Sequence, residues 1–221
     1  MCGIVGYIGK EKCIDRIISG LESLEYRGYD SAGIAYVKDG KIEIKKEQGR
    51  IANLKETIDF DENSYLGIGH TRWATHGKPC KENSHPHRVG KVTLVHNGII
   101  ENYDKLKKEL SDYDYSSETD SEVVAAFIDN ELKSKGILDI LKDLNKTLIG
   151  SYALGIIIDG DDNLYCVRKD SPLIIGVSDD GNYIASDVPA ILRYTNKYYL
   201  LLNDEYACLN SNGVTIYSDG K

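Results

Sequence analysis

Three Asp-Gly pairs, at residues 39–40, 159–160 and 180–181, each separate two short segments with the composition of β-strands. Asp-Gly readily adopts the positive φ angles of the tight turn that joins two antiparallel strands. The paired segments are Ala32–Val37 with Lys41–Lys46, Ser151–Ile158 with Leu164–Lys169, and Leu173–Val177 with Tyr183–Ser186. The chain is therefore expected to build antiparallel sheets, and a doubly wound parallel sheet is disfavoured.

Other segments complete this pattern. Further strands are predicted at Gly3–Ile8, Tyr65–His70, Lys91–His96, Tyr198–Leu202, Tyr206–Asn210 and Val214–Tyr217. Helices are predicted at Cys13–Tyr26, Tyr103–Leu110, Glu122–Lys135 and Leu138–Lys146. Thr119 and Glu122 form a capping box at the start of the helix Glu122–Lys135. Strands at both ends with helices between them indicate an α+β fold, a four-layer αββα sandwich of antiparallel sheets, in a single domain over residues 1–221.

Charge and cysteine content exclude several classes of protein. The formal net charge of −8 argues against a nucleic-acid or anionic-membrane partner. No apolar run approaches the ~20 residues that a membrane helix needs, and charged residues interrupt the region where a signal peptide would be apolar. The five cysteines are widely spaced without a CxxC pair, so we expect a reducing, cytoplasmic environment and no disulfide framework.

A cysteine directly after the initiator methionine is an unusual feature of this chain. Aminopeptidases remove the methionine before a small residue, which would leave Cys2 with both a thiol and a free α-amine. The α-amine has a pKa of ~7.7–8, so it could take the proton of the thiol near neutral pH. The alternative interpretation is a chance cysteine near a frayed terminus.

Two further pairs of residues have a possible chemical role. Asn97 and Gly98 could supply a side-chain amide and a backbone N–H to one oxyanion, although Asn-Gly is also a common turn. Arg72 could bind the α-carboxylate and Asp120 the α-ammonium of an amino acid, although either could be an ordinary surface charge.

All five histidines, at positions 70, 76, 85, 87 and 96, lie within 27 residues, which indicates one concentrated site. His76, Cys80, His85 and His87 could in principle bind zinc, but their spacing matches no known zinc motif. His70 and His96 end apolar strands, so a structural role is favoured for both. We therefore predict no metal and no cofactor.

Seven stretches of the chain together resemble a known family. They are MCGIVGYIG (1–9), LEYRGYDSAG (24–33), GHTRWATHG (69–77), NSHPH (83–87), VHNGIIENY (95–103), SETDSE (117–122) and IASD (184–187). In this order they are similar to the glutaminase domains of glutamine–fructose-6-phosphate aminotransferases, which are N-terminal nucleophile hydrolases. The resemblance runs from residue 2 to about residue 217 and implies the same αββα sandwich.

The resemblance also implies roles for individual residues. Cys2 would attack the side-chain amide of L-glutamine and form a γ-glutamyl thioester, with Asn97 and Gly98 as the oxyanion hole. Arg72 and Asp120 would hold the α-carboxylate and the α-ammonium. The remaining implied residues are Trp73, Thr75 and His76, in a loop that closes over glutamine, and Arg27 and His85, in support of the site.

For the longer members of the family, the resemblance implies a sugar-isomerase domain that uses the ammonia to convert fructose 6-phosphate to glucosamine 6-phosphate, in a homodimer. This chain ends at Lys221, where a linker to such a domain would begin. The glutaminases of amidophosphoribosyltransferase and asparagine synthetase fit less well, the former because it has Tyr-Ser-Thr where this chain has Trp73-Ala74-Thr75. A catalytically silent glutamine-binding module is a further alternative, and it would apply if Met1 is retained.

Overall fold

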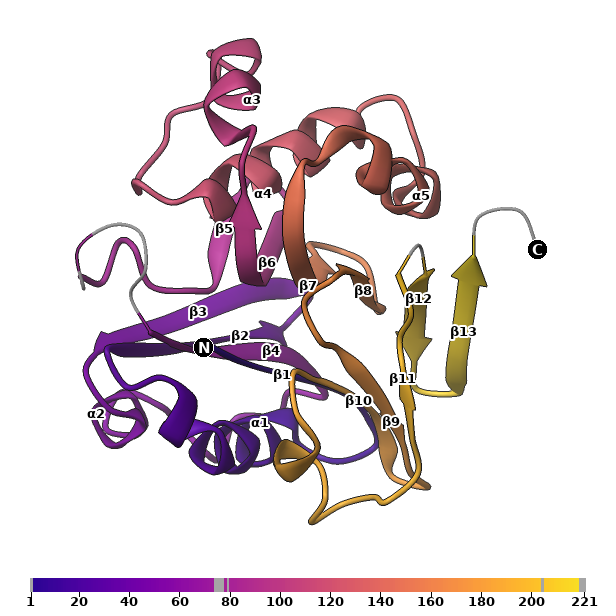
Figure 1. Cartoon of the computed structure of the whole chain (residues 1–221). Coiled ribbons are helices and arrows are strands. Elements are labelled where there is room, and N and C mark those ends of the chain that lie inside the picture. The colour runs from indigo at the N-terminus through magenta and orange to yellow at the C-terminus, as the bar shows by residue number, and fades with distance from the viewer. Residues whose placement is uncertain (1, 74–77, 79, 204, 219–221) are drawn as a thin grey trace.

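Two antiparallel sheets lie face to face at the centre of the computed structural model, which describes residues 2–73, 78, 80–203 and 205–218 (Figure 1). Within these residues one sheet has seven strands in the order β11-β9-β10-β1-β4-β2-β3, and the other has six in the order β13-β12-β8-β7-β6-β5. The strands of the first sheet are β1 Gly3–Gly9, β2 Ser31–Lys38, β3 Lys41–Gln48, β4 Leu66–Arg72, β9 Ile174–Val177, β10 Gly181–Ala185 and β11 Tyr198–Leu200. Those of the second are β5 His87–Val89, β6 Val92–Ile100, β7 Gly150–Ile158, β8 Leu164–Lys169, β12 Glu205–Asn210 and β13 Gly213–Ser218.

Helices cover the outer face of each sheet, which gives four layers (Figure 1). Helices α1 (Cys13–Ser23) and α2 (Ile51–Lys55) pack on the seven-stranded sheet, and α3 (Tyr103–Glu109), α4 (Asp120–Glu131) and α5 (Ile137–Thr147) pack on the six-stranded sheet. Short 3₁₀ turns follow α1 at Glu25–Arg27 and β10 at Val188–Ala190. The predicted αββα sandwich is thus confirmed, whereas α2 and β5 are additional elements that are too short for the sequence pattern to indicate.

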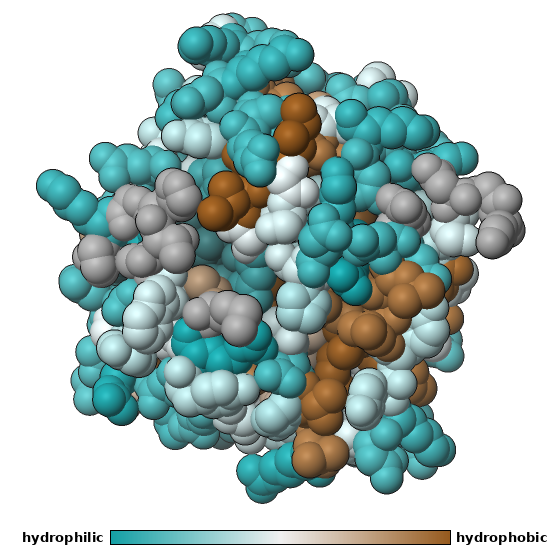
Figure 2. Space-filling model, viewed as in Figure 1, coloured by the Kyte–Doolittle hydropathy of each residue, from teal (hydrophilic) through white to brown (hydrophobic). Residues whose placement is uncertain are grey.

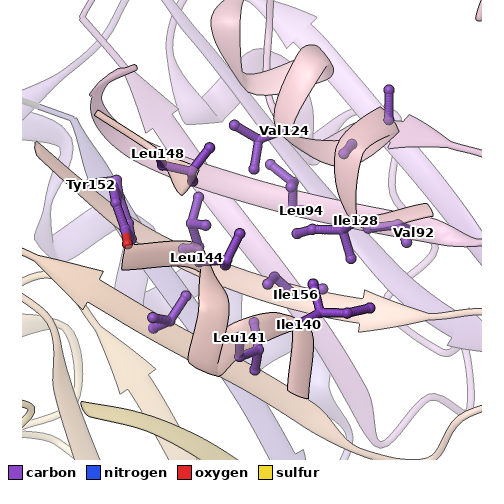
Figure 3. Packing of buried hydrophobic residues seen from close by; sticks show 14 of the residues in the cluster. Val92, Leu94, Val124, Ile128, Ile140, Leu141, Leu144, Leu148, Tyr152 and Ile156 are labelled. Carbon is purple, nitrogen blue, oxygen red and sulfur yellow. The ribbon is translucent and has the colours of Figure 1, made fainter. Parts of the chain in front are cut away.

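Three separate hydrophobic cores hold these layers together. Between the two sheets, Ile4, Ile68 and Val95 belong to a fully buried cluster. A second cluster joins α1 and α2 to the inner strands of their sheet. The third lies under α4 and α5, where Val124, Ile128, Ile140 and Leu144 pack against Val92, Leu94 and Ile156 (Figure 3). The central strands of each sheet are therefore buried on both faces, whereas β3, β11 and β13 are partly exposed.

The register of the hairpins follows the Asp-Gly turns. Asp39 and Gly40 both have positive φ, 48° and 75°, and join β2 to β3 with Lys38 opposite Lys41. Gly160 and Gly181 have φ angles of 78° and 157° at the other two turns. Pairing by these turns fixes which side chains face the space between the sheets.

Helix α4 begins where the sequence pattern indicated a cap. The Thr119 hydroxyl accepts a hydrogen bond from the Glu122 N–H, which is half of the expected capping box. The other half differs, because the Glu122 carboxylate accepts hydrogen bonds from the backbone N–H groups of Ser116 and Ser117 at 2.9 and 2.6 Å. These contacts hold the loop before α4 and so fix the position of Asp120, the first residue of the helix.

Apolar side chains gather on one part of the surface, in a band over β9 to β11 (Figure 2). Tyr198, Tyr199 and Leu200 of the edge strand β11 are between 40 and 50% exposed. The exposed side chains at this edge of the seven-stranded sheet are thus apolar rather than charged. Within the described part of the chain, no helix has the length and apolar character needed to cross a bilayer.

Candidate active site

Strand β1 places the thiol of Cys2 against the end of β4. Gly3 pairs with Thr71, so the residue before β1 lies beside the residues that follow β4. The backbone N–H of Trp73 donates to Cys2 Sγ at 3.3 Å, and the carbonyl oxygen of Trp73 is 3.6 Å from the same sulfur. The thiol is therefore held at an edge where the two sheets meet.

The surroundings of Cys2 favour the neutral thiol. Burial raises the pKa of the Cys2 thiol, and the nearby Asp30 carboxylate acts in the same direction. The Trp73 N–H and the positive charge of Arg72 oppose this effect on the pKa. A reaction of this thiol near neutral pH accordingly needs a base that removes its proton.

Asn97 and Gly98 lie beside Cys2 and do not form a turn. Both are inside β6, opposite Ala153 and Tyr152 of β7, so the interpretation of Asn-Gly as a simple turn is wrong. The Asn97 Nδ2 group donates to the backbone carbonyl of Cys2 at 3.0 Å. The side chain of Asn97, on β6 of one sheet, thus donates a hydrogen bond to the residue that precedes β1 of the other sheet.

Gly98 has a backbone conformation that other residues rarely adopt. Its φ is 133°, and an added Cβ would lie 2.0 Å from the carbonyl oxygen of Ser151 on β7. Any side chain at this position must therefore distort the pairing of β6 with β7 beside Asn97.

We expect Gly98→Ala to lower the free energy of unfolding by roughly 3 kcal/mol or more, because it adds both backbone strain and a clash with backbone. Urea unfolding followed by circular dichroism measures the change. Gly213→Ala is the matched control, since nothing lies within 4 Å of its Cβ position, and it should change stability by less than about 0.5 kcal/mol. Equal stability of the two variants would contradict this account of Gly98.

Arg72 and Asp120 line one cavity next to Cys2. Its volume is about 40 Å³, and its wall also includes Trp73, His85 and Gly98. Asp120 comes from the N-terminus of α4, and its Oδ2 accepts a hydrogen bond from the Ile100 N–H at 2.8 Å. This volume corresponds to about three water molecules.

A wider cavity lies on the other side of Cys2. It has a volume of about 240 Å³ and is lined by Cys2, Trp73, Asn97, Gly98, Arg27, Ile99, Ser151, Ser171 and Pro172. Arg27 forms an ion pair with Asp187 at 3.0 Å. Trp73 is 43% exposed, and the edge of its ring contacts Tyr29. Cys2, Trp73 and Gly98 line both cavities, so the two cavities adjoin at Cys2.

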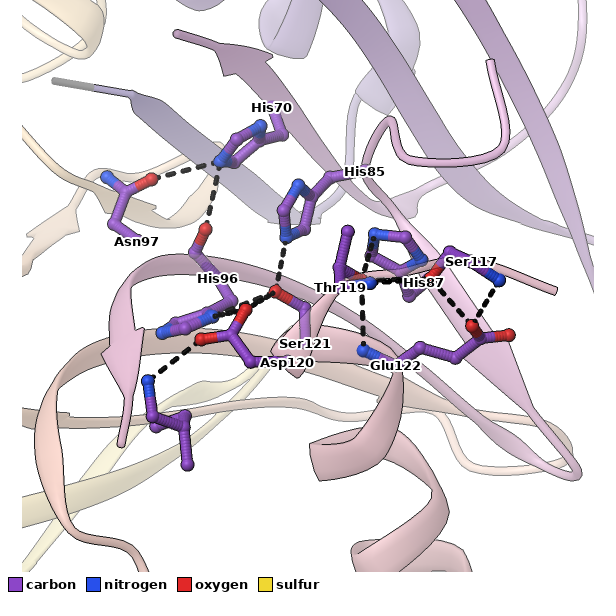
Figure 4. Close-up of polar contacts among 11 residues, drawn as sticks. His70, His85, His87, His96, Asn97, Ser117, Thr119, Asp120, Ser121 and Glu122 are labelled. Carbon is purple, nitrogen blue, oxygen red and sulfur yellow. Dashed lines mark hydrogen bonds and ion pairs between the residues drawn. The ribbon is translucent and has the colours of Figure 1, made fainter. Parts of the chain in front are cut away.

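A buried hydrogen-bond network surrounds Asp120 (Figure 4). Ser121 Oγ is 2.9 Å from both His85 Nε2 and His96 Nδ1 and 3.3 Å from Asp120 Oδ1. Because the carboxylate can only accept, the serine hydroxyl donates to Asp120 and accepts from the two imidazoles. His87 makes a separate contact, with Thr119 at 3.1 Å. Ser121 was not predicted from the sequence, although it follows Asp120 in the SETDSE motif.

Four of the clustered histidines are buried and neutral at physiological pH. Burial lowers the pKa of His70 to about 3, and lowers the pKa values of His85 and His87 well below the ordinary value. Burial also lowers the pKa of His96, and the nearby Asp120 carboxylate partly offsets this. These rings act as hydrogen-bonding groups rather than as charges.

Of the residues predicted for the site, the structure brings Cys2, Arg72, Trp73, His85, Asn97, Gly98 and Asp120 around the two cavities, with Arg27 at the edge of the wider one. Thr75 and His76 lie outside the described residues. In the described part of the chain, no three His, Cys, Asp or Glu side chains are grouped so that they could hold a metal ion. The zinc alternative also included His76, so it is tested only in part.

Comparison with known proteins assigns this chain to a family. A model of the family described as glutamine amidotransferase domain matches residues 70–193. The chain belongs to the glutamine amidotransferase domain family, in its class II. The matched segment of this glutamine amidotransferase domain includes Arg72, Asn97, Gly98 and Asp120.

Curated relatives of this glutamine amidotransferase domain are much longer. The glutamine–fructose-6-phosphate aminotransferase (isomerizing) of Clostridium perfringens is 48% identical over 227 residues, which cover 100% of this chain and 37% of that protein. The enzyme of the same name from Staphylococcus epidermidis is 50% identical over 223 residues, with 98% and 37% covered. The chain thus spans about 37% of the length of these relatives.

A solved structure agrees with the fold of this glutamine amidotransferase domain. The glutamine phosphoribosylpyrophosphate amidotransferase from B. subtilis, in complex with ADP and GMP, superimposes with a TM-score of 0.85 at 27% identity. The match covers 98% of this chain and 49% of that one. The architecture is therefore that of the N-terminal nucleophile hydrolase type found in class II amidotransferases.

Proposed function

We propose that this domain hydrolyses L-glutamine to glutamate and ammonia, with Cys2 as the nucleophile. The observation that carries the proposal is the meeting of the Cys2 thiol, the Asn97 carboxamide and a cavity lined by Arg72 and Asp120. These groups come from four separate segments of the chain, and each suits one part of a glutamine molecule.

The proposed reaction begins once Met1 has been removed. The α-amine of Cys2 takes the thiol proton, and the thiolate adds to the carbon of the side-chain amide. The resulting oxyanion is stabilised by an Asn97 side-chain N–H and the Gly98 backbone N–H. The protonated amine then gives its proton to the departing nitrogen, and the C–N bond breaks to leave a γ-glutamyl thioester and ammonia. Water, deprotonated by the same amine, cleaves the thioester to glutamate.

Charge complementarity supports the proposed orientation of glutamine. The guanidinium of Arg72 can bind a carboxylate with two parallel hydrogen bonds, and the Asp120 carboxylate can bind an ammonium group. Trp73, Thr75 and His76 are proposed to cover the bound substrate. Arg27, through Asp187, and His85, through Ser121, are proposed to support the walls of the site.

The similarity to the aminotransferases supports a proposal about the longer protein. Ammonia from this domain would convert fructose 6-phosphate to glucosamine 6-phosphate at a sugar-isomerase domain, in a cytoplasmic homodimer without a metal or cofactor. The identity of 48–50% with these relatives favours this reaction over that of phosphoribosylpyrophosphate amidotransferase, to which the identity is 27%. A silent glutamine-binding module is the alternative if Met1 remains attached.

A single experiment on the purified chain tests the glutaminase proposal. Intact mass establishes whether Met1 is removed, and glutamate release is then measured before and after treatment with a thiol-directed glutamine analogue. We expect the processed chain to release glutamate, and the analogue to abolish release and attach to Cys2. Attachment at another cysteine, or no release by the processed chain, would refute the proposal.

We expect Arg72→Ala to raise the KM for glutamine by roughly 30-fold with a smaller change in kcat, because it removes a charge-assisted contact made before the transition state. Steady-state glutamate release measures both constants. Arg193→Ala is the control, since Arg193 is exposed and contacts only the Tyr194 ring among the contacts described for it. An unchanged KM in Arg72→Ala would show that Arg72 does not bind the carboxylate.

A further inference from the structure

A contact between His70 and Asn97 joins the two sheets next to Cys2 (Figure 4). His70 is on β4 and is 1% exposed, and Asn97 is on β6 of the other sheet. The Nε2 atom of His70 lies 3.0 Å from the carbonyl oxygen of His96 and 3.0 Å from Asn97 Oδ1. One ring nitrogen therefore contacts both the backbone and the side chain of β6.

These partners determine which nitrogen of His70 carries the proton. The His96 carbonyl can only accept a hydrogen bond, so Nε2 must carry a hydrogen, which it also directs at Asn97 Oδ1. Nδ1 of the same ring is buried, with no hydrogen-bond partner among the described residues. His70 is thus held as the Nε2–H tautomer.

The same reasoning fixes the orientation of the Asn97 carboxamide. Its Nδ2 group donates to the Cys2 carbonyl, which is an acceptor only. If the amide were rotated by 180°, its N–H₂ group would face the N–H of His70, and its oxygen would face the carbonyl of Cys2. Two hydrogen bonds would be replaced by two repulsive contacts, so His70 and the Cys2 carbonyl select one orientation.

Burial makes this donor insensitive to pH. The pKa of His70 falls to about 3 because burial penalises the charged ring, and a second proton on Nδ1 would have no acceptor among the described residues. The ring therefore stays neutral, and keeps its Nε2–H, throughout the pH range in which a cysteine nucleophile operates.

We propose that His70 is a positioning residue, whose Nε2–H fixes the Asn97 carboxamide with its N–H₂ group toward Cys2. One hydrogen of Nδ2 is used by the Cys2 carbonyl, and the second is then available for an oxyanion formed at the thiol. The effect on catalysis rests on the proposed glutaminase function, whereas the hydrogen bond between His70 and Asn97 does not.

Two substitutions of His70 separate the hydrogen bond from the bulk of the ring. His70→Phe keeps a ring but removes the donor, and we expect kcat to fall about tenfold with KM for glutamine unchanged within about twofold, because the oxyanion exists only after substrate has bound. His70→Gln restores an N–H donor and should recover most of the kcat. His87→Gln controls for the loss of a buried imidazole, since His87 contacts Thr119 rather than Asn97.

A double-mutant cycle tests whether His70 acts through Asn97. In an Asn97→Ala background, adding His70→Phe should change kcat by less than about twofold, because the group that it positions is already absent. A further tenfold loss in the double variant would overturn the proposal. So would a His70→Phe variant with the kcat of the unaltered chain.

Nuclear magnetic resonance of the unaltered chain, labelled with ¹³C and ¹⁵N, gives a readout that does not depend on activity or on the stability of a variant. We expect His70 to be protonated on Nε2 and not on Nδ1, with hydrogen-bond coupling across to Asn97. Protonation on Nδ1 would overturn the proposal. An inactive chain that shows the expected tautomer would count against the glutaminase function alone and would support the His70–Asn97 hydrogen bond.

Discussion

The Cys2→Ala variant is expected to release glutamate at least roughly a thousandfold more slowly than the unaltered chain, because Cys2 is the proposed nucleophile and the one cysteine among the described residues that line the two cavities. Its fold should be retained, since the contacts described for the thiol are with the backbone of Trp73 alone. Glutamate release measured at saturating glutamine, together with the thermal midpoint of unfolding, separates loss of chemistry from loss of structure.

A matched control for this variant is Cys208→Ala. Cys208 is also partly buried, and its thiol donates to Asn163 Oδ1 at 3.5 Å. Both residues lie outside the seven motifs described above. We expect its turnover to be within about twofold of the unaltered chain, as is usual for a substitution away from a site. Turnover by Cys2→Ala comparable to that of the control would exclude Cys2 as the nucleophile.

Mild acid is expected to destabilise the domain strongly, because four histidines are buried in the neutral form. For His70, His85, His87 and His96 the folded-state pKa lies below the ordinary value near 6.5. As the pH falls below about 6.5, the unfolded chain therefore binds protons that the folded chain does not bind. Stability is full above that pH and is lost toward the folded-state pKa, by about 2 kcal/mol at pH 5 for His70, whose folded-state pKa is about 3.

Urea unfolding at a series of pH values from 7.5 to 5 measures this dependence. The slope of the free energy of unfolding against pH gives the difference in bound protons between the two states, and His87→Gln should lower it by about one proton. A free energy of unfolding that stays constant between pH 7 and pH 5 would show that these rings are charged in the folded chain.

The strands and helices could be predicted from local patterns because each element depends on neighbours in the sequence. The Asp-Gly turns specify hairpins through their own φ angles, and the apolar spacing over residues 13–26 indicates the face that α1 buries. Helix α2, with five residues, and β5, with three, are too short to show a period. They form because the neighbouring strands and α4 provide partners for them.

The site was predictable only as a set of residue types. A cysteine at position 2, an Asn-Gly pair and an Arg with an Asp indicated possible chemistry, but a turn was the favoured interpretation of Asn97 and Gly98 taken by themselves. The pairing of Asn97 and Gly98 with β7, inside β6, rules out that turn, and the Asn97 carboxamide donates to the Cys2 carbonyl. The contact between Asn97 and Cys2 spans 95 residues of sequence, and no local pattern contains that information.

The sequence by itself determined the antiparallel layers and identified the residues with reactive or charged groups, since both follow from residue type and spacing. Only the tertiary structure decided which of these groups meet. His70 and Asn97 belong to different sheets, and Ser121 joins two histidines to Asp120 from the start of a helix. Such contacts depend on how layers stack, and stacking is set by the fit of complete buried faces rather than by any single motif.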